Sequence, residues 1–228
     1  MFNQQAVPQR SSTELTTATR IRDAAIEVFG DRGFGVGVRA IAAAAGVSPG
    51  LVNHHFGSKD GLRSACDEQV LRLVHDEKLK TLLAPDTGAG MLAALAEVEV
   101  YGPLVAYMIR SLEAGGPMAE SLIEHMIADA EDYIRRGVEA GVIKPSRDPK
   151  ARARYLVMTN TGATLLWVRM HQRDDEKIDF RAAIRRISDE LTTPALELYT
   201  QGMLTDPTLL DEVLKEHDVR DHRNPGPT

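Results

Sequence analysis

Residues 38–56 constrain the fold more than any other part of the chain, because they combine two short helical patterns with a turn between them. An alanine-rich segment at 38–45 ends at Gly46, which suits the left-handed conformation that closes a helix. Ser48 and Pro49 then supply a capping hydroxyl and a proline fitted to the first turn of a second helix. Two short helices joined by a tight turn that contains glycine form a helix-turn-helix.

Composition indicates that the rest of the chain is helical too. Aromatic residues make up 5% of the 228 residues and β-branched runs are short, whereas alanine and leucine are abundant, so local preferences favour helix over sheet. We therefore predict an all-α protein. Beyond residue 84, glycines and prolines separate amphipathic segments at about 90–100, 103–114, 118–140, 149–172, 178–202 and 207–217.

Cysteine usage and hydropathy bear on the compartment. Cys66 is the only cysteine, so no intrachain disulfide is possible and a reducing compartment is expected. No apolar run reaches membrane-spanning length. Residues 1–13 are polar, whereas a signal peptide begins with a charged region that is followed by an apolar one. We expect a soluble, cytoplasmic protein with no membrane partner.

The net charge of −6, taken alone, argues against a nucleic-acid ligand, because DNA affinity comes largely from neutralised phosphates. The distribution is more informative. Residues 10–63 carry seven basic and five acidic side chains, a net charge of +2, so the remainder carries −8. A mildly basic head on an acidic body is compatible with a DNA-binding module attached to a regulatory domain.

The second helix of the motif leaves few side chains free for contact with DNA: Pro49, Gly50, Asn53 and His54. A recognition helix lies in the major groove with its N-terminal part against base edges. The amide of Asn53 can donate one hydrogen bond to adenine and accept another from it, and Leu51 or Pro49 can contact a thymine methyl. A plain helical hairpin shows the same glycine turn and Ser-Pro cap, so this alternative stays open on the motif alone.

The longer run AGVSPGLVNHHFGSKDGL at residues 45–62 resembles the signature of the TetR family of bacterial regulators, and residues 19–34 are similar to the segment that precedes it there. The resemblance is specific over about residues 16–63; elsewhere it extends only to helix number and length. It implies an N-terminal three-helix helix-turn-helix DNA-binding domain, followed by a C-terminal helical ligand-binding and dimerisation domain.

The resemblance also implies a set of DNA-contacting residues, on the recognition helix or flanking it: Arg39, Ser48, Pro49, Gly50, Leu51, Asn53, His54, His55 and Lys59. Lys59 would contact a phosphate, and the helix N-terminus on which it lies independently attracts anions. Two positions depart from the family's pattern. Asn53 stands where members usually carry tyrosine, and Gly37 stands where threonine or serine often begins the first helix of the motif.

The adjacent pair His54 and His55 also raises the question of a metal. Neighbouring residues on a helix point about 100° apart, so the two imidazoles cannot chelate one ion as an i, i+4 pair can. We expect no metal site and no cofactor. His55 is better explained as a packing or phosphate-contacting residue.

Two C-terminal segments carry candidate dimerisation residues. Residues 151–172 place small side chains, which let two helix backbones approach closely, among large ones, and the segment from residue 180 carries an apolar stripe. In the TetR family such helices form a four-helix interface with their symmetry mates. The candidates are Thr159, Gly162, Ala163, Leu166, Trp167, Ile184, Ile187 and Leu191. The same stripes fit an internal core equally well.

The middle segments carry the candidate effector-binding residues: Tyr101, Tyr107, Met108, Met118, His125 and Met126. Methionine and tyrosine suit an adaptable apolar pocket with a few polar handles. They also suit an ordinary core, so each of these residues has a purely structural alternative. The chemistry of the effector does not follow from the sequence.

These patterns predict four parts: a flexible arm at 1–14, the DNA-binding domain at 15–63, the ligand-binding and dimerisation domain at 64–217 and a disordered tail at 218–228. The predicted function is that of a ligand-responsive transcriptional repressor, which binds a palindromic double-stranded DNA operator as a homodimer and is released by a small-molecule effector.

Two other functions compete with this one. A ligand-binding or scaffold protein with weakened DNA binding is compatible with the departures at Asn53 and Gly37. An all-helical enzyme is disfavoured, because the sequence has no glycine-rich phosphate loop, no nucleophile elbow, no metal-ligand spacing and no base beside Cys66.

Overall fold

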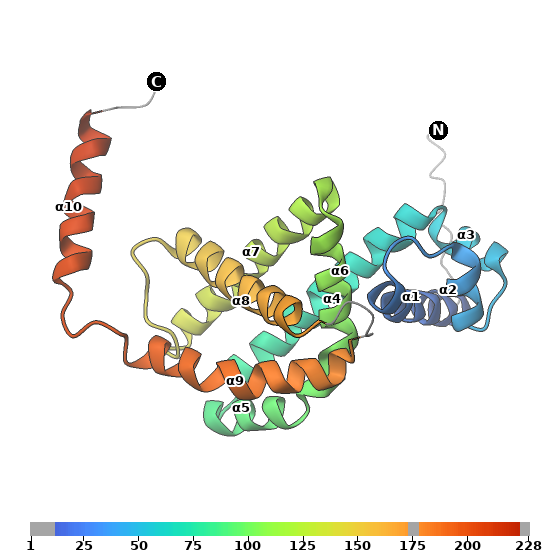
Figure 1. Ribbon diagram of the computed structural model, residues 1–228, viewed down its shortest axis with the longest axis horizontal. Helices are drawn as coiled ribbons and strands as arrows, with labels where there is room; N and C mark the ends of the chain where they lie inside the picture. Colours follow the sequence, from blue (N-terminus) through green and yellow to red (C-terminus); the bar gives the residue numbers. More distant parts are fainter. Residues whose placement is uncertain (1–11, 173–177, 224–228) are drawn as a thin grey trace, which may run out of the picture. The chain divides into compact units, whose positions relative to one another are not determined.

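A computed structural model of the chain describes residues 12–172 and 178–223 (Figure 1). Within these residues every regular element is helical, which confirms the predicted all-α class. The elements are α1 (Ser12–Arg32), α2 (Val38–Ala44), α3 (Pro49–Phe56), α4 (Lys59–Leu82), α5 (Thr87–Ala96), the short 3-10 helix η1 (Val98–Tyr101), α6 (Gly102–Ala114), α7 (Gly116–Glu139), α8 (Pro149–His171), α9 (Phe180–Thr200) and α10 (Thr208–Arg223).

The chain divides into two compact units, residues 1–188 and 189–228, and the boundary falls inside α9. The expected domain boundary at residue 63 lies within the first unit, inside the continuous helix α4. In the second unit, no residue of α10 whose side chain is described is buried.

Three hydrophobic clusters hold the first unit together. The first surrounds Phe29 and Ile41, and joins α1, α2, α3 and the beginning of α4 to Tyr107 of α6. The second packs α6 against α8 and α9 around Trp167, and the third packs α7 against α8 around Ile134. Because α6 contributes to the first two clusters, it connects the amino-terminal helices to the rest of the unit.

Helix ends differ from expectation at three places. The segment expected at 90–100 begins earlier, because the Asp86 carboxylate caps α5 by accepting from the Ala89 amide at 2.9 Å, and η1 then separates it from α6. The described parts of the expected arm and tail, residues 12–14 and 218–223, are helical rather than irregular. Residues 1–11 and 224–228 lie outside the described range.

Among the described residues, no single helix is both long and apolar enough to cross a membrane. Residues 88–96 and 98–114 meet that test only as a pair, and the pair is bent by 63°.

Candidate nucleic-acid interface

The start of α3 has the geometry that the sequence predicts. Gly46 adopts a left-handed φ of 65°, and the Val47 amide donates to the Ala42 carbonyl at 2.9 Å, which closes α2. Ser48 is extended, and its hydroxyl accepts from the Leu51 amide at 3.3 Å, with Pro49 at the first helical position. The cap fixes where α3 begins.

The two faces of α3 differ in burial and in chemistry. Val52 is 1% exposed and packs in the amino-terminal cluster, which fixes the rotation of the helix about its axis. Most of the predicted DNA-contacting residues on this segment are exposed: Ser48, Pro49, Gly50, Leu51, Asn53 and His54, with His55 half-buried. The structure therefore gathers them on one solvent-facing surface, which we call the α3 face.

Helix α2 adds Arg39, whose side chain is exposed. The helix lacks a side-chain cap, because Gly37 occupies the N-cap position in an extended conformation with φ −84° and ψ 157°. A serine or threonine at this position normally stabilises a helix start by about 1 kcal/mol. The departure at Gly37 thus leaves the start of α2 held by packing rather than by a cap.

Lys59 begins α4 but does not extend freely into solvent. It is half-buried, and its ammonium group donates to the backbone carbonyl of Phe34, in the loop between α1 and α2. The Ser58 hydroxyl caps the same helix by accepting from the Gly61 amide at 3.0 Å. Lys59 therefore ties the start of α4 to the α1–α2 loop, a contact that the sequence did not reveal.

The two histidines of α3 lie edge to face, with ring centroids 5.4 Å apart and an interplanar angle of 69°. Across the described residues, no group of three or more histidine, cysteine, aspartate or glutamate side chains is placed to hold a metal ion.

Tyr107, a candidate for the effector site, lies in the amino-terminal cluster. It is fully buried, and its hydroxyl donates to the Asp67 carboxylate at 2.7 Å. Burial and the bond to Asp67 raise the pKa of the phenol far above its ordinary value, so it remains a neutral donor. The contact joins residues 40 apart in the chain, which is why local patterns could not find it.

The other effector candidates differ in their surroundings. Met108 and Met126 pack on different clusters, and the exposed His125 points its Nδ1 at the Ser121 carbonyl at 2.8 Å. Tyr101 in η1 and Met118 in α7 are half-buried. Burial and the neighbouring Glu77 raise the pKa of Tyr101 to about 12.

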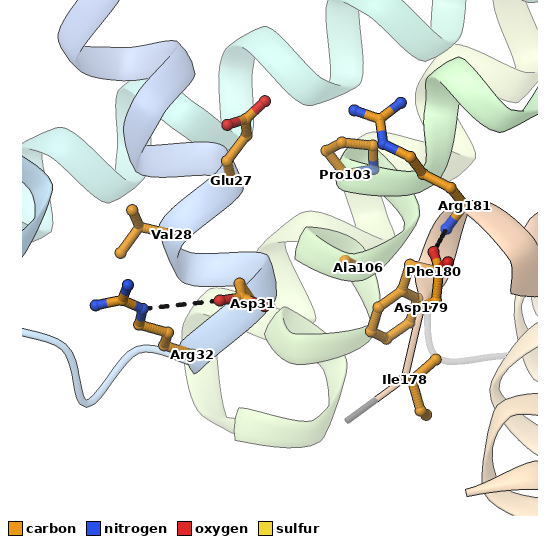
Figure 2. Close-up of a pocket in the computed structure, with 10 residues that line it drawn as sticks. All are labelled: Glu27, Val28, Asp31, Arg32, Pro103, Ala106, Ile178, Asp179, Phe180 and Arg181. Atoms are coloured by element: carbon orange, nitrogen blue, oxygen red, sulfur yellow. Dashed lines mark hydrogen bonds and ion pairs between the residues drawn. The ribbon is translucent and has the colours of Figure 1, made fainter. Parts of the chain in front are cut away.

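A cleft of about 520 Å³ opens between α1, α6 and the start of α9 (Figure 2). Its lining comprises Glu27, Val28, Asp31, Arg32, Pro103, Ala106, Ile178, Asp179, Phe180 and Arg181, and includes none of the six effector candidates. Arg32 pairs with Asp31 at 3.7 Å, and the Asp179 carboxylate accepts from the Arg181 amide at 2.9 Å. Much of the polar lining is therefore already engaged within the protein.

Burial divides the dimerisation candidates into two sets. Trp167, Ile184 and Ile187 belong to the internal cluster with α6, and Ala163 is half-buried. Thr159, Gly162, Leu166 and Leu191 are exposed. On α8, Gly162 and Leu166 belong to an exposed stripe at three- and four-residue spacing, which we call the α8 stripe: Tyr155, Met158, Gly162, Leu166 and Met170. Tyr155, Met158 and Met170 were not among the residues predicted from the sequence.

The described chain is all-helical, and its amino-terminal part exposes the capped second helix of a helix-turn-helix. This is the architecture of a DNA-binding transcriptional regulator. Comparison with known proteins supports this class. Residues 21–66 match the model of the bacterial regulatory proteins of the tetR family, and residues 99–205 match that of a tetracyclin repressor-like C-terminal domain.

The HTH-type transcriptional regulatory protein RaaS of Mycobacterium tuberculosis is 49% identical to the chain over 205 residues, which cover 90% of the chain and 95% of that protein. The chain belongs to the TetR family, and it is a helix-turn-helix transcriptional regulator.

Solved structures show the same fold. A tetR-family regulator from Streptomyces coelicolor superimposes with a TM-score of 0.54 and 19% identity, covering 92% of this chain and 97% of its own. FadR from Bacillus subtilis, solved in complex with stearoyl-CoA, has a TM-score of 0.54 and 18% identity, covering 82% and 99%.

Proposed function

We propose that the protein is a ligand-responsive repressor that binds a palindromic operator as a homodimer, with the α3 face of each subunit in the major groove. The observation that carries the proposal is the division of α3, whose buried Val52 leaves Asn53 and His54 exposed beside a capped N-terminus. Such a helix offers base-contacting side chains without disturbing its own core. A DNA ligand implies a cytoplasmic protein.

The contacts are assigned by chemistry and position. Asn53 would read adenine, Leu51 or Pro49 would contact a thymine methyl, and Gly50 would allow close approach to the backbone. Arg39 on α2 and Lys59 at the start of α4 would neutralise phosphates and so fix the register of the helix on DNA. Ser48, His54 and His55 complete the surface as phosphate or sugar contacts.

We assign dimerisation to the α8 stripe. Leu191, which lies in the second unit, remains a further candidate for the dimer interface. Tyr155, Met158, Leu166 and Met170 are each more than 60% exposed, and a Cβ added to Gly162 among them would meet no atom within 4 Å. An apolar stripe with a small residue at its centre suits a twofold contact with the same stripe of a second copy. Two α3 faces would then be presented to successive turns of DNA.

The effector is proposed to be a small molecule bound by the C-terminal helices. This is supported by FadR, a protein of the same fold that was solved in complex with stearoyl-CoA. Its binding would favour a subunit arrangement in which the two α3 faces no longer match the spacing of the grooves. Regulation then needs no chemical step, and we propose that the protein is not an enzyme.

The DNA contacts are tested by fluorescence anisotropy on duplex DNA from upstream of its own gene, at several salt concentrations. Arg39→Ala and Lys59→Ala should each weaken binding and lower the slope of log K against log salt by about 1. Arg147→Ala, which removes an exposed charge from the loop before α8, serves as the control and should change neither. Absent or salt-independent binding would favour the ligand-binding or scaffold alternative.

The dimer is tested by analytical ultracentrifugation of Leu166→Asp, which places a charge on the α8 stripe at a side chain 61% exposed in the single subunit. The subunit should remain folded, while its dimer dissociation constant rises more than about tenfold. Leu92→Asp is the matched control, since Leu92 on α5 is 69% exposed. Equal effects of the two variants would exclude the α8 stripe as the interface.

A further inference from the structure

The loop between α1 and α2 is held at one residue, Phe34, by three side chains from two helices, α4 and α6. The Arg63 guanidinium of α4 lies over its ring, with Cζ 3.8 Å from the centroid, and Lys59 donates to its carbonyl. Tyr107 of α6 meets the same ring edge to face, with centroids 5.5 Å apart and an interplanar angle of 83°. Phe34 therefore joins α4 and α6 to the loop that leads into α2.

Tyr107 is itself fixed at both ends. Its hydroxyl donates to the Asp67 carboxylate at 2.7 Å and lies 3.3 Å from the Arg63 carbonyl oxygen, both on α4, while its ring packs on Phe34. The ring is also fully buried, so its displacement would disturb the side chains packed around it.

The backbone of α6 is equally close to α1. A Cβ added to Gly30 would lie 3.0 Å from the Ala106 Cβ and 3.1 Å from the Tyr107 nitrogen, which shows how tightly the two helices approach. Arg110 reinforces the contact by donating to the Gly30 carbonyl at 3.4 Å. A displacement of α6 must therefore move its partners in the amino-terminal cluster.

The opposite side of α6 faces the C-terminal helices. Val105 and Ile109 pack with Trp167 of α8 in the second cluster, and Met108 contacts both clusters. Helix α6 thus lies between the first and the second cluster. The buried Nε and Nη2 atoms of Arg63 have no hydrogen-bond partner, and its guanidinium contacts the loop through the Phe34 ring.

We propose that Tyr107 and Phe34 are positioning residues for DNA binding, through which α6 sets the place of α2 and α3. The contact connects α6 directly to the loop at 33–37, so the packing of Tyr107 on Phe34 should determine where Arg39 and the α3 face lie. This inference rests on the proposed docking of α3 on DNA.

The experiment is a double-mutant cycle in the full chain, with Phe34→Leu and Tyr107→Leu, read by anisotropy on duplex DNA from upstream of its own gene. Each single variant should weaken binding by about 2- to 30-fold at a temperature where circular dichroism shows it folded. The double variant should bind about as weakly as the weaker single one, because both changes break the same contact.

Two further variants separate positioning from folding. Tyr107→Phe keeps the ring on Phe34 and loses only the bond to Asp67, so its DNA affinity should lie between those of wild type and Tyr107→Leu. Ser111→Ala is the matched control: Ser111 lies one turn further along α6, is fully buried, and its hydroxyl has no partner. Its removal should leave DNA binding unchanged.

Hydrogen exchange gives a readout that does not need DNA. Tyr107→Leu should accelerate exchange in residues 33–44, and Ser111→Ala should not. The proposal is overturned if the losses in affinity multiply, if Tyr107→Leu lowers the melting temperature with no change in affinity, or if exchange at 33–44 is unaffected. If the wild-type protein fails to bind DNA, the proposed function fails, and the exchange measurement still decides the role of Tyr107.

Discussion

At the scale of single residues, burial determines the chemistry of Cys66. The thiol is completely inaccessible and donates to the Arg22 carbonyl at 3.7 Å, and burial, with the nearby Asp67 carboxylate, raises its pKa to about 12. Because the thiolate is the nucleophile, Cys66 should not react with Ellman's reagent in the folded protein at pH 8. One equivalent should react after denaturation, and rapid labelling of the native state would contradict the described packing.

The carboxyl group of Asp67 supplies a pH test of the buried network. Burial raises the pKa of this carboxyl group, and its effect exceeds the lowering of the pKa by the hydrogen bond from Tyr107 and by the charge of Arg63. Ionisation of Asp67 at neutral pH therefore reduces the stability of the folded state. Asp67→Asn keeps an acceptor for Tyr107 and removes that cost. Its stability relative to wild type should be greatest near pH 7 and should decline as pH falls through the folded-state pKa of Asp67. The measurement is urea unfolding of both proteins across this range, and a difference that grows toward acid would refute the assignment.

At the scale of elements, the cap of α3 connects local sequence to function. Ser48→Ala should destabilise the start of α3 by about 1 kcal/mol and weaken DNA binding, because the Leu51 amide loses its acceptor. Ser48→Gly should cost only a few tenths of that amount, since glycine is itself a tolerated cap. Denaturant unfolding and anisotropy of the pair provide the comparison. Equal effects of alanine and glycine would show that the hydroxyl does not act as a cap.

The elements also show what local sequence determines and what it leaves open. Gly46 and the Ser48-Pro49 pair act on their own neighbours, so the bounds of α2 and α3 could be predicted. The place of Tyr107 depends on residues about 40 positions away, and no periodicity encodes that distance. Leu166 and Trp167 are adjacent, yet one is exposed and the other buried, because α6 covers only one side of α8.

At the scale of the whole molecule, α10 buries little apolar surface. It lies beyond residue 205, where the match to the family model ends, and its Leu209 and Leu210 are 63% and 58% exposed. A chain ending at residue 205 should therefore melt within about 2 °C of the full chain, because little apolar burial is lost. Calorimetry of the two chains tests this, and a clearly larger decrease would show that α10 is covered in the native protein.

Affinity cleavage shows whether the α3 face enters a groove of bound DNA. Because Cys66 is buried, Asn53→Cys offers a single reactive thiol for an iron chelate that cuts nearby DNA. Bound to its operator, this protein should produce two sets of cuts separated by about 10 base pairs or a multiple of that spacing. A chelate on Arg147→Cys should produce none. Cuts from position 147 but not from position 53, with the protein bound, would show that the α3 face does not enter the groove.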